Sequence, residues 1–90
     1  MKITWDKKKD NLNILKHNIC FETAARVFLD ENRIEFYDDI HSLNEDRYIT
    51  IGCVHEIIMV VYTVRRSKIR LISARIATRR EREWYYEENC

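Results

Sequence analysis

Residues 57–76 read IIMVVYTVRRSKIRLISARI, and this stretch decides the fold. The run from Ile57 to Val64 is continuous, apolar and rich in β-branched residues, which is typical of a central strand covered on both faces. After a turn over residues 65–68, residues 69–76 return as a second strand with arginines at both ends. The stretch therefore predicts an antiparallel hairpin at the centre of a sheet.

The length of this turn decides which face of the sheet its arginines occupy. A two-residue turn would pair Arg65 with Lys68 and place Arg75 on the opposite face from Arg65. A three-residue loop would pair Arg65 with Ile69 and bring Arg65 and Arg75 to one face. Because a shift of one residue moves every side chain to the other face, the sequence leaves both arrangements open.

The elements before the hairpin follow from hydrophobic periodicity. Residues 3–5 alternate as a short strand, and Asp6 can cap a helix over residues 7–17 with Leu12 and Leu15 as its apolar stripe. A second helix is predicted over residues 21–29, where apolar side chains recur at helical spacing: Phe21, Ala24, Ala25 and Phe28. Alternation then predicts strands near residues 34–37 and 48–51, separated by a polar connection.

After the hairpin, Thr78-Arg79-Arg80-Glu81 fits a capping box for a final helix that ends near Glu88. The full order is strand, two helices, four antiparallel strands and a helix, which predicts an α+β fold. Ninety residues are enough for a single domain over residues 1–90.

Composition excludes several classes of protein. The longest apolar run, Ile57 to Tyr62, is too short to span a membrane, and no apolar signal core follows the N-terminus. Three widely spaced cysteines without a Cys-x-x-Cys pair favour a reduced cytoplasmic protein. His17 and Cys20 have ligand spacing but no second pair, so we expect no metal and no other cofactor.

Charge is strongly segregated along the chain. Residues 65–82 carry eight basic side chains against Glu81 alone, whereas residues 30–56 carry eight acidic side chains against two arginines. A basic cluster this dense indicates a polyanionic partner such as RNA. The alternative is a solvated charged face that balances the acidic middle of the chain.

Five residues are candidates for chemistry on a phosphodiester. Arg65 and Arg75 could bind the scissile phosphate and stabilise transition-state charge, because a guanidinium offers a planar set of donors. His17, His41 and Glu45 are candidate proton-transfer groups. The structural alternatives are ion pairs for the arginines, a helix cap for His17, and simple solvation for His41 and Glu45.

Other side chains are candidates for RNA binding, the cations through phosphates and the aromatics through base stacking. The aromatic candidates could instead belong to the core. The predicted set is Lys16, Arg47, Arg70, Arg79, Arg80, Trp5 and Tyr62.

Several short stretches together resemble the BrnT family, small ribonucleases of bacterial toxin–antitoxin pairs. None is specific alone, but their joint order and spacing are. They include Trp5-Asp6, Lys16-His17 before Phe21-Glu22, Ala24 to Phe28, Glu45-Asp46-Arg47, and Arg70 to Arg75 leading to Glu81. One departure is Cys20, where the family usually has a serine that caps the second helix.

The resemblance implies a RelE-like toxin fold, with two N-terminal helices packed on an antiparallel sheet. It also implies a BrnA-type antitoxin that blocks the toxin, with operator DNA bound only through the complex. We therefore expect an endoribonuclease that works without a metal, because RNA carries its own nucleophile. The competing expectation is a non-catalytic module that binds nucleic acid or protein through residues 65–82.

Overall fold

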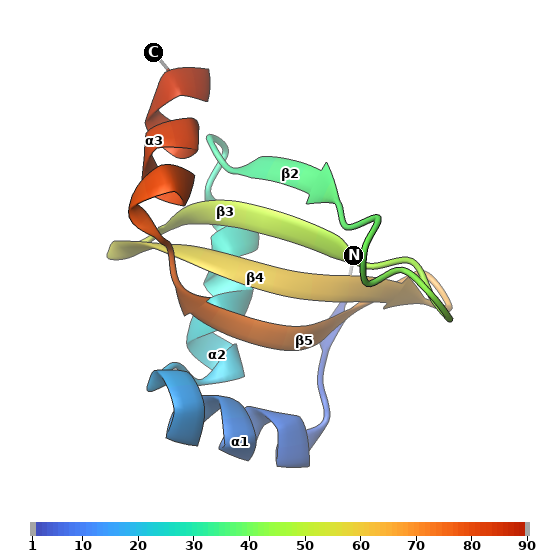
Figure 1. The fold of residues 1–90 in the computed structure, drawn as a ribbon. Coiled ribbons are helices and arrows are strands. Elements are labelled where there is room, and N and C mark those ends of the chain that lie inside the picture. The colour runs from blue at the N-terminus through green and yellow to red at the C-terminus, as the bar shows by residue number, and fades with distance from the viewer. Residues whose placement is uncertain (1, 90) are drawn as a thin grey trace.

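The computed structural model describes residues 2–89 and confirms the predicted α+β class. A five-stranded sheet has the spatial order β1-β5-β4-β3-β2 (Figure 1). Among residues 2–89, no helix is long and apolar enough to cross a membrane. In chain order the elements are β1 (Ile3–Thr4), α1 (Lys7–His17), α2 (Phe21–Ala24), a 3₁₀ helix η1 (Ala25–Leu29), β2 (Ile34–Tyr37), β3 (Tyr48–Val54), β4 (Glu56–Arg65), β5 (Lys68–Ile76) and α3 (Arg79–Glu88).

The second helical segment is not one continuous α-helix, so that part of the prediction is wrong. It begins as α2 and tightens into η1 after Ala24. The fully buried side chains are Phe21, Ala24 and Val27. They recur every three residues, which matches the three residues per turn of a 3₁₀ helix better than the α-helical period. Cys20 stands at the N-cap of α2, where its side chain makes no cap hydrogen bond to the helix backbone; instead its Sγ lies 3.2 Å from the hydroxyl of Thr23.

The sheet is mixed rather than purely antiparallel. Strands β2 to β5 pair antiparallel, as predicted. β1, however, pairs parallel with β5, with Ile3 opposite Ile69 and Thr4 opposite Arg70. The Thr4 hydroxyl also donates to the Ile69 carbonyl at 3.1 Å. This contact joins residues 65 positions apart, so the local sequence pattern could not predict it.

Two hydrophobic clusters cover the two faces of the sheet. The larger lies under the N-terminal helices and includes Phe21, Val60, Leu71 and Ala74. The smaller lies under α3 and includes Ile51, Ile57, Met59, Ala77 and Tyr85. The Tyr85 hydroxyl donates to Asp30 at 2.6 Å, which ties α3 to the end of η1. Both faces of the central strand β4 are therefore buried, as its continuous apolar sequence predicts.

Helix α1 is held by a polar residue and not by the predicted apolar stripe. Leu12 and Leu15 are exposed, whereas Asn13 is buried. The Asn13 side-chain amide donates to the Ala74 carbonyl at 2.9 Å and accepts from the Ala74 amide at 3.0 Å. It also donates to the Ile19 carbonyl at 2.9 Å. Asn13 therefore occupies the edge of β5 with hydrogen bonds that a neighbouring strand would otherwise supply.

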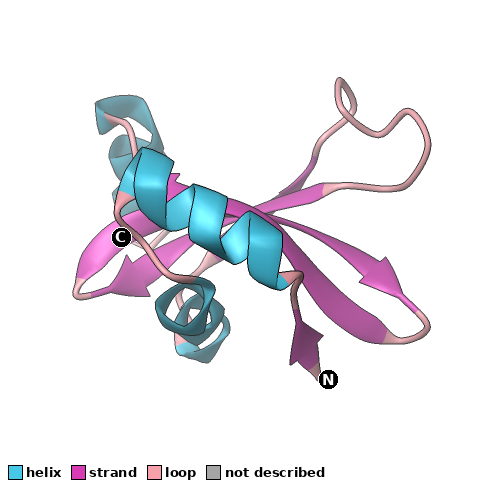
Figure 2. Cartoon of the chain, turned by 90° about the horizontal axis from the view of Figure 1, so that it is seen from below, coloured by secondary structure: helices cyan, strands magenta, loops and turns pink. Residues whose placement is uncertain are grey.

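Gly52 allows η1 to pack directly on β3. A Cβ atom at this position would lie 2.7 Å from Cγ2 of Val27 and 3.1 Å from Cβ of Arg33. The first distance is shorter than real side chains tolerate, so with a larger residue at this position Val27 or η1 would have to shift. In Figure 2 the N-terminal helices lie across the sheet, and the long loop after β2 projects beyond its end.

The β4–β5 hairpin combines a tight turn with a bulge. Arg65 pairs with Lys68 across a two-residue turn, in which Arg66 and Ser67 have φ values of 51° and 64°. The pairing then shifts by one residue between Val61 and Tyr62. The bulge reverses the alternation of β5 beyond it. Arg75 therefore lies on the same face as Arg65, and the opposite-face arrangement expected for a two-residue turn is wrong.

Candidate active site

Residues 38–47, the 38–47 loop between β2 and β3, are closed on themselves by hydrogen bonds. The Asp38 amide donates to the Arg47 carbonyl at 2.9 Å. The Ser42 hydroxyl donates to the Asp38 carbonyl at 2.5 Å and accepts from the Arg47 amide at 2.9 Å. Thr63 of β4 donates to the Asp46 carbonyl at 2.6 Å. The predicted polar connection therefore has a defined shape that is attached to the central strand.

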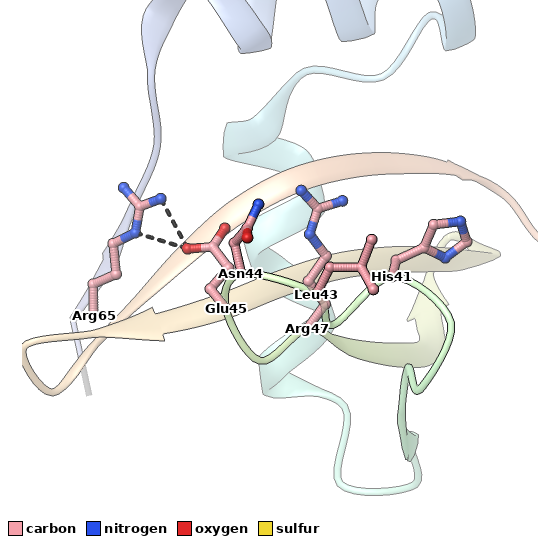
Figure 3. A pocket seen from close by; sticks show the side chains of 6 residues that line it. All are labelled: His41, Leu43, Asn44, Glu45, Arg47 and Arg65. Atoms are coloured by element: carbon pink, nitrogen blue, oxygen red, sulfur yellow. Dashed lines mark hydrogen bonds and ion pairs between the residues drawn. The ribbon is translucent and has the colours of Figure 1, made fainter.

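An open cleft of about 380 Å³ lies between the 38–47 loop and the end of β4 (Figure 3). It brings together four residues that the sequence predicted for chemistry or RNA binding. Figure 3 shows Glu45 and Arg65 toward one end of the cleft and His41 at the other, with Arg47 between them. The lining residues are His41, Leu43, Asn44, Glu45, Arg47 and Arg65.

Arg65 and Glu45 form the ion pair at one end of the cleft. Arg65 donates through Nε and Nη2 to the same oxygen of Glu45, at 3.2 and 2.9 Å. The two side chains are 55% and 29% exposed. Water screens an ion pair this exposed, so it adds little to stability. The pair instead holds a guanidinium and a carboxylate in place where a ligand can reach both.

Arg47 brings an uncompensated positive charge to the cleft. None of the ion pairs formed among residues 2–89 includes Arg47. Its Nε is buried without a hydrogen-bond partner in this part of the chain. Figure 3 shows the other two guanidinium nitrogens directed away from the backbone of the loop. A phosphate oxygen is the kind of acceptor that this geometry suits.

His41 is held by Asp38, a residue that the sequence analysis did not single out. Nδ1 of His41 lies 2.9 Å from Oδ2 and 3.2 Å from Oδ1 of Asp38. The His41 amide also donates to Asp38 at 3.3 Å. The imidazole is 65% exposed, whereas the Asp38 carboxylate is 11% exposed. An aspartate three residues before a histidine in a polar loop is a turn signal that could have indicated this contact.

Comparison with known proteins decides the family. Residues 5–81 match the family model described as "Ribonuclease toxin, BrnT, of type II toxin-antitoxin system". The chain belongs to the BrnT family. Its structure is similar to the 1.1 Å crystal structure of the Brucella abortus ribonuclease toxin, BrnT, with 31% sequence identity and a TM-score of 0.70. The match covers 88% of this chain and 99% of the Brucella chain.

No curated protein matches the chain significantly. Membership of the BrnT family makes the chain a ribonuclease toxin of a type II toxin–antitoxin system, with RNA as its substrate and an antitoxin as its partner.

Arg75 lies far from the cleft, at the other end of the hairpin. Its partner on β4 is Met59, six residues before Arg65, so roughly 20 Å of strand separates the two arginines. Arg75 donates to both oxygens of Glu81, at 2.8 and 3.0 Å. Glu81 also accepts from the Thr78 amide at 2.8 Å, which completes the predicted capping box of α3. The structure does not bring Arg65 and Arg75 together on one phosphate.

The Glu81 carboxylate titrates abnormally because of these contacts. Burial by itself would raise its pKa, but the hydrogen bonds from Arg75 and the Thr78 amide outweigh burial and lower the pKa below the ordinary value of 4.5. The Arg75–Glu81 ion pair therefore belongs to the N-terminal cap of α3.

Lys16 and His17 lie in a different groove of the BrnT-family toxin. This groove, of about 220 Å³, runs between α1 and the edge of β5.

The other predicted arginines lie on β5 and α3. Arg70 pairs with Thr63 on the face of the sheet that Arg65 occupies. On α3, Arg79 pairs with Glu83 at 3.3 Å. Arg80 lies over the ring of Trp84, 5.2 Å from its centroid.

The two aromatic candidates belong to the core of the toxin. Trp5 packs edge-on against Phe21, with ring centroids 6.4 Å apart. Tyr62 is buried and stacks on Tyr48 at 5.5 Å. Burial, with the nearby Glu35, raises the pKa of Tyr62 far above its ordinary value. Tyr62 is therefore enclosed in the core, whereas Trp5 is only partly buried at the edge of the same cluster.

Proposed function

We propose that this BrnT-family toxin cleaves RNA without a metal ion, in the cleft between the 38–47 loop and β4. The observation that supports this proposal is the convergence of two guanidinium groups with a carboxylate and an imidazole: Arg47, Arg65, Glu45 and His41. RNA supplies its own nucleophile, the 2′-hydroxyl. An enzyme then needs only a base, an acid and fixed positive charge.

In this proposal the arginines bind the scissile phosphate. Among residues 2–89, Arg47 forms no ion pair with a carboxylate and so offers the stronger electrostatic attraction. Arg65 reaches the cleft from the end of β4, where its hydrogen bonds to Glu45 hold its orientation. Fixed donors of this kind stabilise charge that develops on the phosphoryl oxygens in the transition state.

Further cations would attract the rest of the RNA. Arg70 shares the sheet face of Arg65, and Arg79 and Arg80 extend the positive charge onto α3. Because none of these three side chains lines the cleft, we assign them to binding and not to chemistry. The groove that holds Lys16 and His17 is assigned no step of the reaction.

The partners follow from the family. We propose that residues 1–90 form one toxin domain with a RelE-like fold, and that a BrnA-type antitoxin blocks it. Operator DNA would be bound only through the toxin–antitoxin complex. We place the reaction in the cytoplasm, where cellular RNA is found.

The test is cleavage of RNA by the purified protein in EDTA. We expect the wild-type protein to cut, and Arg47→Ala and Arg65→Ala to cut far less. Arg66→Ala is the matched control, because it removes the same charge from the adjacent turn residue without altering the lining of the cleft. RNA that is bound but left whole by the wild-type protein would overturn the proposal in favour of a non-catalytic binding module.

A further inference from the structure

The cleft contains two groups that can transfer a proton, and their partners differ. One carboxylate oxygen of Glu45 accepts two hydrogen bonds from Arg65, which suits Glu45 to the role of proton acceptor. The imidazole of His41 faces the Asp38 carboxylate through Nδ1. Among residues 2–89, Nε2 of His41 has no hydrogen-bond partner, so this nitrogen is free to meet a substrate.

We infer that Asp38 is a positioning residue that presents His41 as the general acid, while Glu45 serves as the general base. This inference rests on the ribonuclease activity proposed for the cleft. Asp38 has the rigidity that the role needs, because its amide and carbonyl are both bonded within the 38–47 loop. A carboxylate on Nδ1 fixes the orientation of the ring and balances its charge when both nitrogens are protonated.

The reaction balances with these groups alone. The Glu45 carboxylate takes the proton of the 2′-hydroxyl, and the 2′-oxygen forms a bond to phosphorus. The bond from phosphorus to the 5′-oxygen breaks, and the leaving oxygen takes the Nε2 proton of His41. The products are a 2′,3′-cyclic phosphate and a 5′-hydroxyl end. Proton exchange with water restores Glu45 and His41, while Asp38 keeps its hydrogen bond to Nδ1.

The layout of the cleft suits this division of roles. In-line attack places the entering and leaving oxygens on opposite sides of the phosphorus, so the base and the acid must also lie on opposite sides. Figure 3 shows Glu45 and His41 toward opposite ends of the cleft, with the Arg47 guanidinium between them. Arg47 is therefore placed to hold the phosphate that both groups must reach.

The experiment compares two dinucleotide substrates, one with the natural 5′-oxygen and one with sulfur as the bridging leaving atom. A thiolate leaves without a proton, so a missing general acid matters only for the oxygen substrate. We expect His41→Ala to lose about 100- to 1,000-fold in kcat on the oxygen substrate. Asp38→Asn should lose roughly 10- to 100-fold. Both variants should approach the wild-type rate on the sulfur substrate, whereas Glu45→Gln should be slow on both.

Asp39→Asn is the matched control, because it removes the same charge from the adjacent exposed position. We expect its kcat to stay close to that of the wild-type protein. Nitrogen-15 NMR of the imidazole supplies a readout that needs no activity: the Nδ1 signal of His41 should shift in Asp38→Asn and stay unchanged in Asp39→Asn. This readout also shows that the Asp38→Asn protein is folded.

Different results overturn different claims. If Asp38→Asn cuts the oxygen substrate as fast as the wild-type protein, Asp38 does not position His41. If the loss in His41→Ala persists on the sulfur substrate, His41 is not the general acid. If the wild-type protein cuts neither substrate nor longer RNA, the proposed ribonuclease site itself is wrong.

Discussion

The two ends of the β4–β5 hairpin each carry an arginine bound by a glutamate, yet the two pairs do different work. Arg65 and Glu45 join the hairpin to an exposed loop and line a cleft. Arg75 and Glu81 are less exposed, at 33% and 14%, and also fix the first turn of α3. In this protein the Arg75–Glu81 pair stabilises the start of α3 because its carboxylate has a second structural partner, whereas the Arg65–Glu45 pair lines a cleft that a ligand can reach.

The largest effect should come from breaking the pair at the cleft. Arg65→Ala is expected to lower kcat/KM for RNA about 100- to 1,000-fold, because it removes a fixed donor from the transition state. The free energy of unfolding should change by less than about 1 kcal/mol, since the pair is exposed. Cleavage assays and urea denaturation measure the two quantities. A loss of stability that matched the loss of activity would erase the contrast between the two pairs.

Breaking the pair at α3 should have the opposite profile. Arg75→Ala is expected to lower the free energy of unfolding by about 2 kcal/mol, because it leaves the largely buried Glu81 carboxylate without its strongest donor. The activity per folded molecule should stay within about tenfold of the wild-type value. Arg79→Ala, which breaks the exposed pair with Glu83, is the control and should cost under 1 kcal/mol, roughly. Equal losses in the two variants would contradict this assignment.

Acid should weaken the α3 pair in a predictable direction. The pKa of Glu81 is lowered in the folded protein, so its contribution is present above the unfolded pKa and is lost as pH falls through the folded value. We expect the stability difference between the wild-type protein and Glu81→Gln to be largest near neutral pH. It should shrink as the pH falls below 4.5, the ordinary value for this group. Urea denaturation at a series of pH values measures the difference, and a gap that widened in acid would refute the sign.

The smallest effect concerns the turn that carries Arg65. Ser67 has a φ of 64°, in the left-handed region where glycine is unstrained. Ser67→Gly should therefore raise the free energy of unfolding by up to about 1 kcal/mol. Activity should be unchanged, because the pairing of Arg65 with Lys68 is kept. Lower thermal stability in this variant would mean that Ser67 makes a contribution beyond its backbone conformation.

The sequence predicted the parts of the fold that local patterns determine. The hairpin, the two-residue turn as one of two alternatives, and the capping box at Thr78 all follow from neighbouring residues. The bulge between Val61 and Tyr62 did not, because no residue near it differs in pattern from a regular strand. Since the bulge reverses the facing of Arg75, one unpredicted residue changed the geometry at that end of the hairpin.

Four of the six residues that line the cleft were candidates from the sequence, whereas two further candidates for chemistry, His17 and Arg75, lie elsewhere. His41, Glu45, Arg47 and Arg65 were recognisable because their side chains suit phosphate chemistry. Arg65 could not be matched to Glu45, which lies 20 residues away, in preference to any other acid of the 30–56 segment. Helix α1 illustrates the same limit, because its docking depends on Asn13 and Ala74, 61 residues apart.

The Asn13 contact also has a consequence for how copies of the toxin meet in solution. A bare strand edge offers unpaired amides and carbonyls to any other strand, which is a common route to aggregation. At Ala74 both backbone groups are already bonded to one side-chain amide, and α1 stands over that edge. A strand from a second molecule would have to displace a helix before it could add to the sheet. Asn13 therefore prevents a strand of a second toxin molecule from pairing with this edge of β5. Such protection is valuable to a protein whose central strand is almost wholly apolar.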